Sequence, residues 1–319
     1  EGGTVENLTV KGSVSGQSNV AGLVGSLKNG TVMNCANNAD VTGVSAVGGV
    51  VGYVGGASVI RQCYNSGTVS GTQGYIGGVT GQHWQAGEVQ DCYNVGTVKG
   101  PATVGGISGG HKASSPALAN CYNVGEIIDS TGNSNNIGAV IGASKGSNTN
   151  CYYIKGKGTD SKSGITEVDA LTAAMLSDAF KEDEDGLNGG YPVLTWQKRV
   201  PDVIINSYEE FKSLADKVNN GESYEGQLIR LDVNLYLGGE KNPWTPIGSS
   251  ADVSFKGVFD GNYHTISGLY VEATSQNMGL FGVVQGGTVK NLVVQGQVKG
   301  TSYVGGVVAR LKGGSLVNC

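Results

Sequence analysis

The chain has 319 residues, of which 55 are Gly and only 15% are charged, and its formal net charge is −5. The glycines follow no strict three-residue period, which excludes collagen, and a hydrophobic content of 39% argues against simple disorder. The thinly spread basic residues argue against nucleic acid or an anionic membrane surface as a partner, and no apolar run approaches the roughly 18 residues that a membrane span needs.

Cysteines mark a short repeat in the first half of the chain. Five of them recur at steps of 28, 29, 29 and 30 residues: Cys35, Cys63, Cys92, Cys121 and Cys151. A Val-containing segment and then a Gly-rich segment follow the cysteines, as in residues 68–71 and 76–81. Three short β-type segments in a period of about 29 residues are what one coil of a parallel β-helix requires. The sequence therefore predicts an all-β solenoid, right-handed because crossovers between parallel strands almost always are.

The cysteines are predicted to form a column in the core. Leu8 and Leu292 occupy two equivalent positions, and Leu and Cys share a column when it is buried and apolar. Val41, Val69 and Val98 should point inward from the following strand. Disulfides between neighbouring coils are an alternative, although stacked side chains point the same way, which is poor disulfide geometry. A zinc site is less favoured still, because the sequence holds no Cys-x-x-Cys pair.

A longer repeat relates the two ends of the chain. Residues 1–35 align without a gap on residues 285–319, at an offset of 284 residues and with 19 identities over 35 positions. The chain is thus expected to run from within one solenoid domain into the next. We expect the parent protein to be a tandem array of this 284-residue unit, so that neighbouring units are partners of one another.

Composition divides the chain into three parts. Residues 1–157 hold 7 of the 26 acidic residues and should be the C-terminal part of a first β-helix domain. Residues 158–200 are expected to be a cap and linker, with a helix over roughly 167–180 and a closing strand at 191–196 over the open solenoid end. The acidic residues at 182–185, between the expected helix and the closing strand, do not fit the spacing of a Ca²⁺-binding loop.

Residues 201–319 should be a helical cap and the first coils of a second β-helix domain. Ser207 provides a helix cap, and Phe211, Leu214, Ala215 and Val218 follow at helical spacing. Strand-like segments come after this helix, at residues 227–237, 255–259 and 265–271.

Short Gly-rich motifs resemble a known family. Three segments are similar to the GLUG motif of bacterial repeats: residues 21–25, 49–52 and 279–282. The opening coils of such domains are similar to residues 244–248 and 259–269 of this chain. Their closing segment is similar to residues 187–196. The family occurs in surface adhesins and beside IgA-cleaving metallopeptidases, so the resemblance implies a secreted or wall-linked bacterial protein. The His-Glu-x-x-His motif of the peptidases is absent from the sequence, and the resemblance carries no catalytic residue across.

Two polar columns accompany the cysteines. An aromatic residue follows most of them directly: Tyr64, Tyr93, Tyr122 and Tyr152. If the cysteines point inward, these tyrosines point outward as a stripe on one face. The stripe either covers apolar surface and stabilises stacking, or binds a glycan or a protein. An amide column of Asn37, Asn65, Asn94 and Asn123 is expected to be structural.

Catalysis and metal binding are disfavoured. Glycoside hydrolysis needs paired carboxyl groups, and Glu88 and Asp91 fall in one turn without partners at the matching places of neighbouring coils. His83 and His111 occupy equivalent turn positions and are expected to be stacked surface histidines without function. We therefore expect no enzymatic activity, cofactor or metal.

The sequence predicts a non-catalytic structural and adhesive segment of a tandem-repeat bacterial cell-surface protein, which would form a stiff extracellular stalk or fibre. One alternative is an adhesin module that binds a host glycan or protein through the tyrosine stripe. A carbohydrate-active β-helix enzyme is less favoured. Like subunits in a fibre are further candidate partners.

Overall fold

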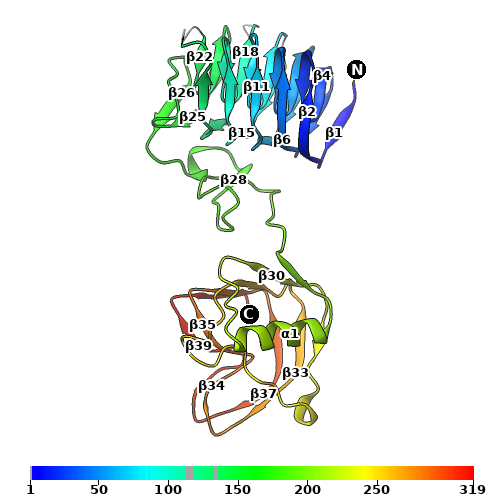
Figure 1. Cartoon of the computed structure of the whole chain (residues 1–319), viewed down its shortest axis with the longest axis vertical. Helices are drawn as coiled ribbons and strands as arrows, with labels where there is room; N and C mark the ends of the chain where they lie inside the picture. Colours follow the sequence, from blue (N-terminus) through cyan, green and yellow to red (C-terminus); the bar gives the residue numbers. More distant parts are fainter. Residues whose placement is uncertain (1, 86, 113–117, 133–135) are drawn as a thin grey trace. The chain divides into compact units, whose positions relative to one another are not determined.

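The computed structural model describes residues 2–85, 87–112, 118–132 and 136–319. The chain forms two compact units, Glu1–Lys198 and Arg199–Cys319. Both are parallel β-solenoids, so the prediction of an all-β fold of stacked coils is confirmed (Figure 1). Of the predicted cap and linker at residues 158–200, residues 158–198 belong to the first unit.

The first unit stacks short strands into parallel sheets. One sheet contains β1 (Thr4–Glu6), β5 (Thr31–Met33), β9 (Val59–Arg61), β14 (Glu88–Gln90), β19 (Leu118–Ala119) and β24 (Asn148–Thr149). A second contains β2 (Thr9–Ser15), β6 (Ala36–Gly43), β10 (Tyr64–Asn65), β11 (Val69–Gly71), β15 (Tyr93–Asn94), β16 (Val98–Gly100), β20 (Tyr122–Asn123), β21 (Ile127–Asp129), β25 (Cys151–Ile154) and β26 (Ile165–Val168).

Two further sheets complete each coil. The third contains β3 (Ser18–Ala21), β7 (Ser45–Gly48), β12 (Ile76–Gly77), β17 (Val104–Gly105) and β22 (Ile137–Gly138). The fourth contains β4 (Val24–Lys28), β8 (Val51–Gly55), β13 (Thr80–His83), β18 (Ser108–His111) and β23 (Ile141–Ser144). The Gly-rich segments of the sequence supply these two sheets, with the glycine pair at the corner between them.

The register gives the coil length directly. In the first sheet Thr4 pairs with Thr31, Val59 with Glu88, and Leu118 with Asn148, which are steps of 27, 29 and 30 residues. Equivalent side chains therefore lie above one another along the solenoid. Val41 and Val69 are fully buried in one such column, as predicted.

The last coil of the first unit is closed by a loop rather than by a helix. The carboxylate of Asp160 accepts hydrogen bonds from the backbone N–H groups of Val140 (3.1 Å) and Ile141 (3.0 Å). It thus takes the place of the one carbonyl oxygen that accepts from the equivalent pair of N–H groups in earlier coils, such as Val140 O for Ile107 and Ser108. β26 then pairs with β25, Cys151 lying beside Ile165.

The predicted helix over residues 167–180 is wrong. Residues up to Val168 are taken by β26, and only Ala173–Met175 forms a 3₁₀ turn, η1. Thr166 lies inside the strand that extends the second sheet, so the backbone is extended where the helix is expected to begin. Leu171 and Phe180 are buried against tyrosine side chains instead of forming one helical face.

The predicted closing strand is β28 (Val193–Leu194), which pairs antiparallel with β27 (Phe180–Lys181). This hairpin belongs to a segment, residues 171–197, that we call the strap. The strap does not lie over the solenoid end as expected. It packs on the flank, against the tyrosine column of the second sheet (Figure 1).

The second unit repeats the architecture. Its strands are β29 (Val203–Ile205), β30 (Leu228–Leu231), β32 (Val258–Asp260), β36 (Thr288–Lys290) and β40 (Ser315–Val317) in one sheet, and β31 (Leu235–Tyr236), β33 (Thr265–Glu272) and β37 (Val293–Lys299) in another. β34 (Gln276–Met278) pairs with β38 (Ser302–Val304), and β35 (Phe281–Gln285) with β39 (Val308–Lys312). A 3₁₀ turn, η2, spans Gly239–Lys241.

The second unit holds a helix at the place where the sequence predicts one. Helix α1 spans Tyr208–Asn219, and the Ser207 side chain accepts a hydrogen bond from the Glu210 N–H at its first turn. Phe211 is fully buried and its ring stacks on Trp244 at 5.2 Å between centroids. Burial of such an apolar face, worth about 1.5–3 kcal/mol for each large side chain, fixes the helix on the solenoid.

Candidate functional site

The five cysteines lie in the core of the first unit. Cys35, Cys63, Cys92, Cys121 and Cys151 are all fully buried and all free thiols. Each Sγ lies 3.0–3.3 Å from the carbonyl oxygen two residues earlier in the chain, so the thiols donate to backbone instead of pairing with one another. Burial raises the pKa of the Cys92 thiol well above its ordinary range, because a thiolate would lose its solvation there. The column is built for packing rather than for nucleophilic or redox chemistry.

A ladder of buried amides runs beside the cysteines. The Nδ2 group of Asn37 donates to Oδ1 of Asn65, Asn65 donates to Asn94, and Asn94 to Asn123, at 2.7, 2.7 and 2.8 Å. Each amide also donates to a carbonyl two residues later in its own coil, as Asn65 does to Gly67 at 2.8 Å. Buried polar groups need hydrogen-bond partners, and here the amide of each coil is the partner of the amide in the next coil.

The tyrosines form a stack of rings. The Tyr64 and Tyr93 centroids are 5.0 Å apart with 5° between the ring planes, and those of Tyr93 and Tyr122 are 4.9 Å apart with 2°. Each ring therefore presents its faces to its neighbours in the adjacent coils. Stacked pairs of this kind add about 0.5–1.5 kcal/mol beyond the area that they bury.

The strap covers this stack. Tyr93 donates its hydroxyl to Oε1 of Gln197 (2.9 Å), and Tyr122 donates to the carbonyl of Pro192. The Nδ2 group of Asn188 donates to the Tyr122 hydroxyl at 2.7 Å. Tyr93 and Tyr122 are 1% and 0% exposed, and Tyr64 and Tyr152 are partly buried.

The expectation of an exposed, ligand-facing stripe of Tyr64, Tyr93, Tyr122 and Tyr152 is corrected by this burial. A sugar can stack only on a free ring face that solvent can reach. At the centre of the stripe the ring faces contact one another and the ring edges contact the strap. Burial raises the pKa of Tyr122 as well, which keeps its hydroxyl a donor. The stripe serves as the docking surface for the protein's own residues 171–197.

The two histidines are interior residues, not surface ones as expected. His83 and His111 are 0% and 2% exposed, and their rings meet edge to face at 4.3 Å. They lie on β13 and β18, in register with Val54 and Ser144 of the flanking coils. Burial, together with the charge of His111, lowers the pKa of His83 to about 3. His83 is therefore neutral at physiological pH and is not a general base or acid in that range.

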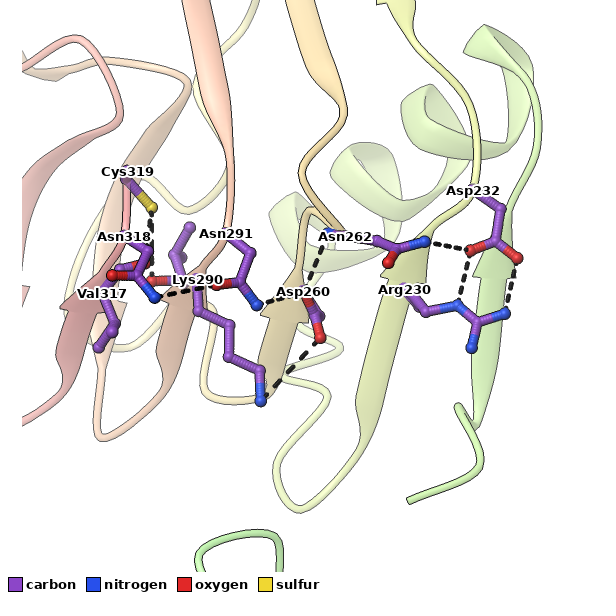
Figure 2. Close-up of polar contacts among 10 residues, drawn as sticks. Arg230, Asp232, Asp260, Asn262, Lys290, Asn291, Val317, Asn318 and Cys319 are labelled. Atoms are coloured by element: carbon purple, nitrogen blue, oxygen red, sulfur yellow. Dashed lines mark hydrogen bonds and ion pairs between the residues drawn. The ribbon is translucent and has the colours of Figure 1, made fainter. Parts of the chain in front are cut away.

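Asp232 and Asp260 belong to neighbouring coils of the second unit, and each has a cation beside it (Figure 2). Arg230 donates to both oxygens of Asp232 at 2.6 and 2.7 Å, and Lys290 lies 4.0 Å from Asp260. The Arg230 guanidinium lowers the pKa of Asp232. A carboxyl group held ionised in this way does not serve as a general acid.

The same row continues as an amide ladder. Asn318 donates to Asn291 at 3.2 Å, and Asn291 donates to Asp260 at 3.0 Å (Figure 2). Asn291 and Asn318 have positive φ angles of 53° and 52°, a conformation that Asn tolerates better than most residues. The row fastens coil to coil, which is a structural role.

Within the described part of the chain, no group of three or more His, Cys, Asp or Glu side chains is placed to hold a metal ion. No described helix is long and apolar enough to cross a membrane.

Comparison with known proteins gives three similarities. Residues 43–70 match the family model described as the GLUG motif. Halomucin of Haloquadratum walsbyi is 32% identical over 116 residues, which cover 33% of this chain and about 1% of the length of halomucin. The crystal structure of a proposed immunoglobulin A1 protease from Bacteroides ovatus has a TM-score of 0.50 and 23% identity, over 62% of this chain and 71% of that one. This last similarity shows a shared fold. The chain is a parallel β-solenoid that carries the GLUG motif.

Proposed function

We propose that the chain is a non-catalytic structural and adhesive segment of a cell-surface repeat protein. The observation that carries the proposal is the continuity of the side-chain columns, in which thiols, amides and aromatic rings of each coil contact those of the next. Together with the parallel backbone hydrogen bonds, these contacts join each solenoid into a stiff body, the property that a stalk needs.

The GLUG motif and the similarity to halomucin support placement at a cell surface. The 284-residue repeat between residues 1–35 and 285–319 supports a tandem array in which such bodies follow one another. The absence of enzymatic activity remains part of the proposal. It is supported by the neutral His83 and by the ion-paired Asp232 and Asp260.

The test is antibody labelling of intact cells of the source organism, using antibodies raised against the purified 319-residue chain. We expect labelling without permeabilisation and loss of the label after brief protease treatment of whole cells. Labelling only after permeabilisation would contradict the proposed location. Purified chain that degrades a polysaccharide or an immunoglobulin would contradict the non-catalytic role.

A further inference from the structure

One hollow on the first unit has a chemistry that the proposed function does not use. Its volume is about 460 Å³, and it lies beside β18 and β23, away from the strap. Its lining residues include Tyr75, Lys112, Asn136, Ser144, Lys145 and Lys162.

Two of these lysines occupy the same position in successive coils. His111 pairs with Ser144, so the residues that follow them, Lys112 and Lys145, lie next to each other. The Lys145 N–H donates to the His111 carbonyl at 3.3 Å, which ties the two coils together at this point. Neighbouring strands stack about 4.8 Å apart, and like charges at such positions repel each other.

No carboxylate compensates this pair. Within the described part of the chain, no acidic side chain forms an ion pair with Lys112 or Lys145, and residues 113–117 and 133–135 contain no Asp or Glu. Lys162 is 3.2 Å from Asp160, but that carboxylate is committed to the backbone N–H groups at the solenoid end. The hollow therefore carries a net positive charge in a chain whose formal net charge is −5.

Aromatic rings hold one cation at the rim. The Nζ of Lys112 lies 3.9 Å from the ring centroid of Trp84 and 5.2 Å from that of Tyr75. Trp84 is 45% exposed, a large exposed fraction for a tryptophan. The Tyr75 ring packs over Gly110, where a Cβ atom would come within 2.9 Å of it, so the wall of the hollow is fixed.

We propose that this hollow binds an anionic saccharide, with a carboxylate or sulfate group between Lys112 and Lys145. Such a group would relieve the repulsion between the two ammonium groups. Asn136 and the lone pairs of Ser144 offer hydrogen bonds to sugar hydroxyls. Cations repeated from coil to coil match charges repeated along a polysaccharide.

The inference names a ligand for the adhesive part of the proposed function, but it depends only on the site. Binding is measured on the purified 319-residue chain by isothermal titration calorimetry. The probes are polygalacturonate as a carboxylated chain, heparin as a sulfated chain and dextran as a neutral one. We expect binding of at least one anionic probe, weakening with added salt, and none of dextran.

The variants are matched in charge. Lys112→Gln with Lys145→Gln should weaken binding about tenfold, since two exposed ion pairs are lost. Lys11→Gln with Lys99→Gln removes the same charge from exposed positions of the second sheet and should leave binding unchanged. Circular dichroism during heating checks that both double variants fold like the parent.

Three outcomes would overturn the inference. They are absence of binding to both anionic probes, equal binding of dextran, and equal loss in the two double variants, which would indicate attraction without a site. None of these outcomes bears on the cell-surface location, which the intact-cell labelling tests separately.

Discussion

At Gly78 the solenoid has no room for a side chain. A Cβ atom there would lie 2.1 Å from the carbonyl oxygen of Gly106 and 2.4 Å from the amide carbon of Asn94. The same holds along the column, where Gly49 faces Asn65 and Gly106 faces Asn123. The second glycine of each pair is thus required both by a backbone carbonyl and by the amide ladder of the next coil.

The end of the ladder supports this reading. Ala139 follows Gly106 in the glycine column, and Tyr153 follows Asn123 in the amide column. Alanine thus stands at the position whose counterpart in the next coil is no longer an asparagine.

We predict that Gly78→Ala destabilises the first unit by about 3 kcal/mol, at the upper end of overpacking costs, because the opposing atom is backbone and cannot move aside. Urea unfolding followed by circular dichroism measures the change. Gly3→Ala is the control, since nothing lies within 4 Å of the added methyl group and the φ angle of Gly3 is not positive. Similar loss in both variants would contradict the steric account.

The buried tyrosines predict a dependence of stability on alkaline pH. Burial raises the pKa of Tyr93 and Tyr122 above the unfolded value of about 10. The unfolded chain then loses protons more readily than the folded one, so stability is fully present below pH about 10 and falls as the pH rises beyond it. Urea unfolding at increasing pH should show this fall. Replacing Tyr93 and Tyr122 by Phe should reduce its slope, and an unchanged slope would show that the two rings are accessible to solvent when folded.

At the scale of elements, the strap decides what the tyrosine column does. The sequence predicts the outward direction of these rings correctly from the two-residue alternation of a strand. The sequence does not reveal that the strap covers these rings, because the contacts join residues that are far apart in the sequence, such as Gln62 and Trp196. The spacing of the apolar residues in the strap also fits one face of a helix, which is why the sequence predicts a helix there when the surface they pack against is unknown.

We predict that Gln197→Leu loosens the strap. Its Oε1 accepts hydrogen bonds from the Tyr93 hydroxyl and the Leu194 N–H, and both donors would be left buried without a partner. The expected cost is about 2–3 kcal/mol. Limited proteolysis measures the loosening, and we expect faster cleavage of the strap in this variant. Gln73→Leu, which changes an exposed glutamine, is the control. Equal protection of both variants would contradict the role of Gln197.

At the scale of the molecule, the repeats predict the fold because a solenoid is a one-dimensional problem. The spacing of Cys35, Cys63 and Cys92 indicates coil length and register at once, and the cap of α1 is local in sequence. The hollow beside Lys112 and Lys145 was missed, although a signal existed. The alignment that pairs His111 with Ser144 also places Lys112 and Lys145 in one column.

The central claim is that equivalent residues lie directly above one another from coil to coil. Ser15 pairs with Thr42, Thr42 with Ser70, Ser70 with Lys99 and Lys99 with Ile128. Cysteines introduced for spin labelling at Ser15, Lys99 and Ile128 form a ruler along this column. Cys319, which is exposed, is replaced by Ser, and the five buried cysteines should remain unlabelled in the folded chain.

The decisive measurement is the distance between spin labels, by electron paramagnetic resonance, for the pairs at positions 15 and 99 and at positions 15 and 128. Three and four coil steps of about 4.8 Å predict backbone separations of about 14 and about 19 Å, increasing by one step from the first pair to the second. Distances that do not grow by one step, or labelling of the buried cysteines before unfolding, would contradict the stacked solenoid.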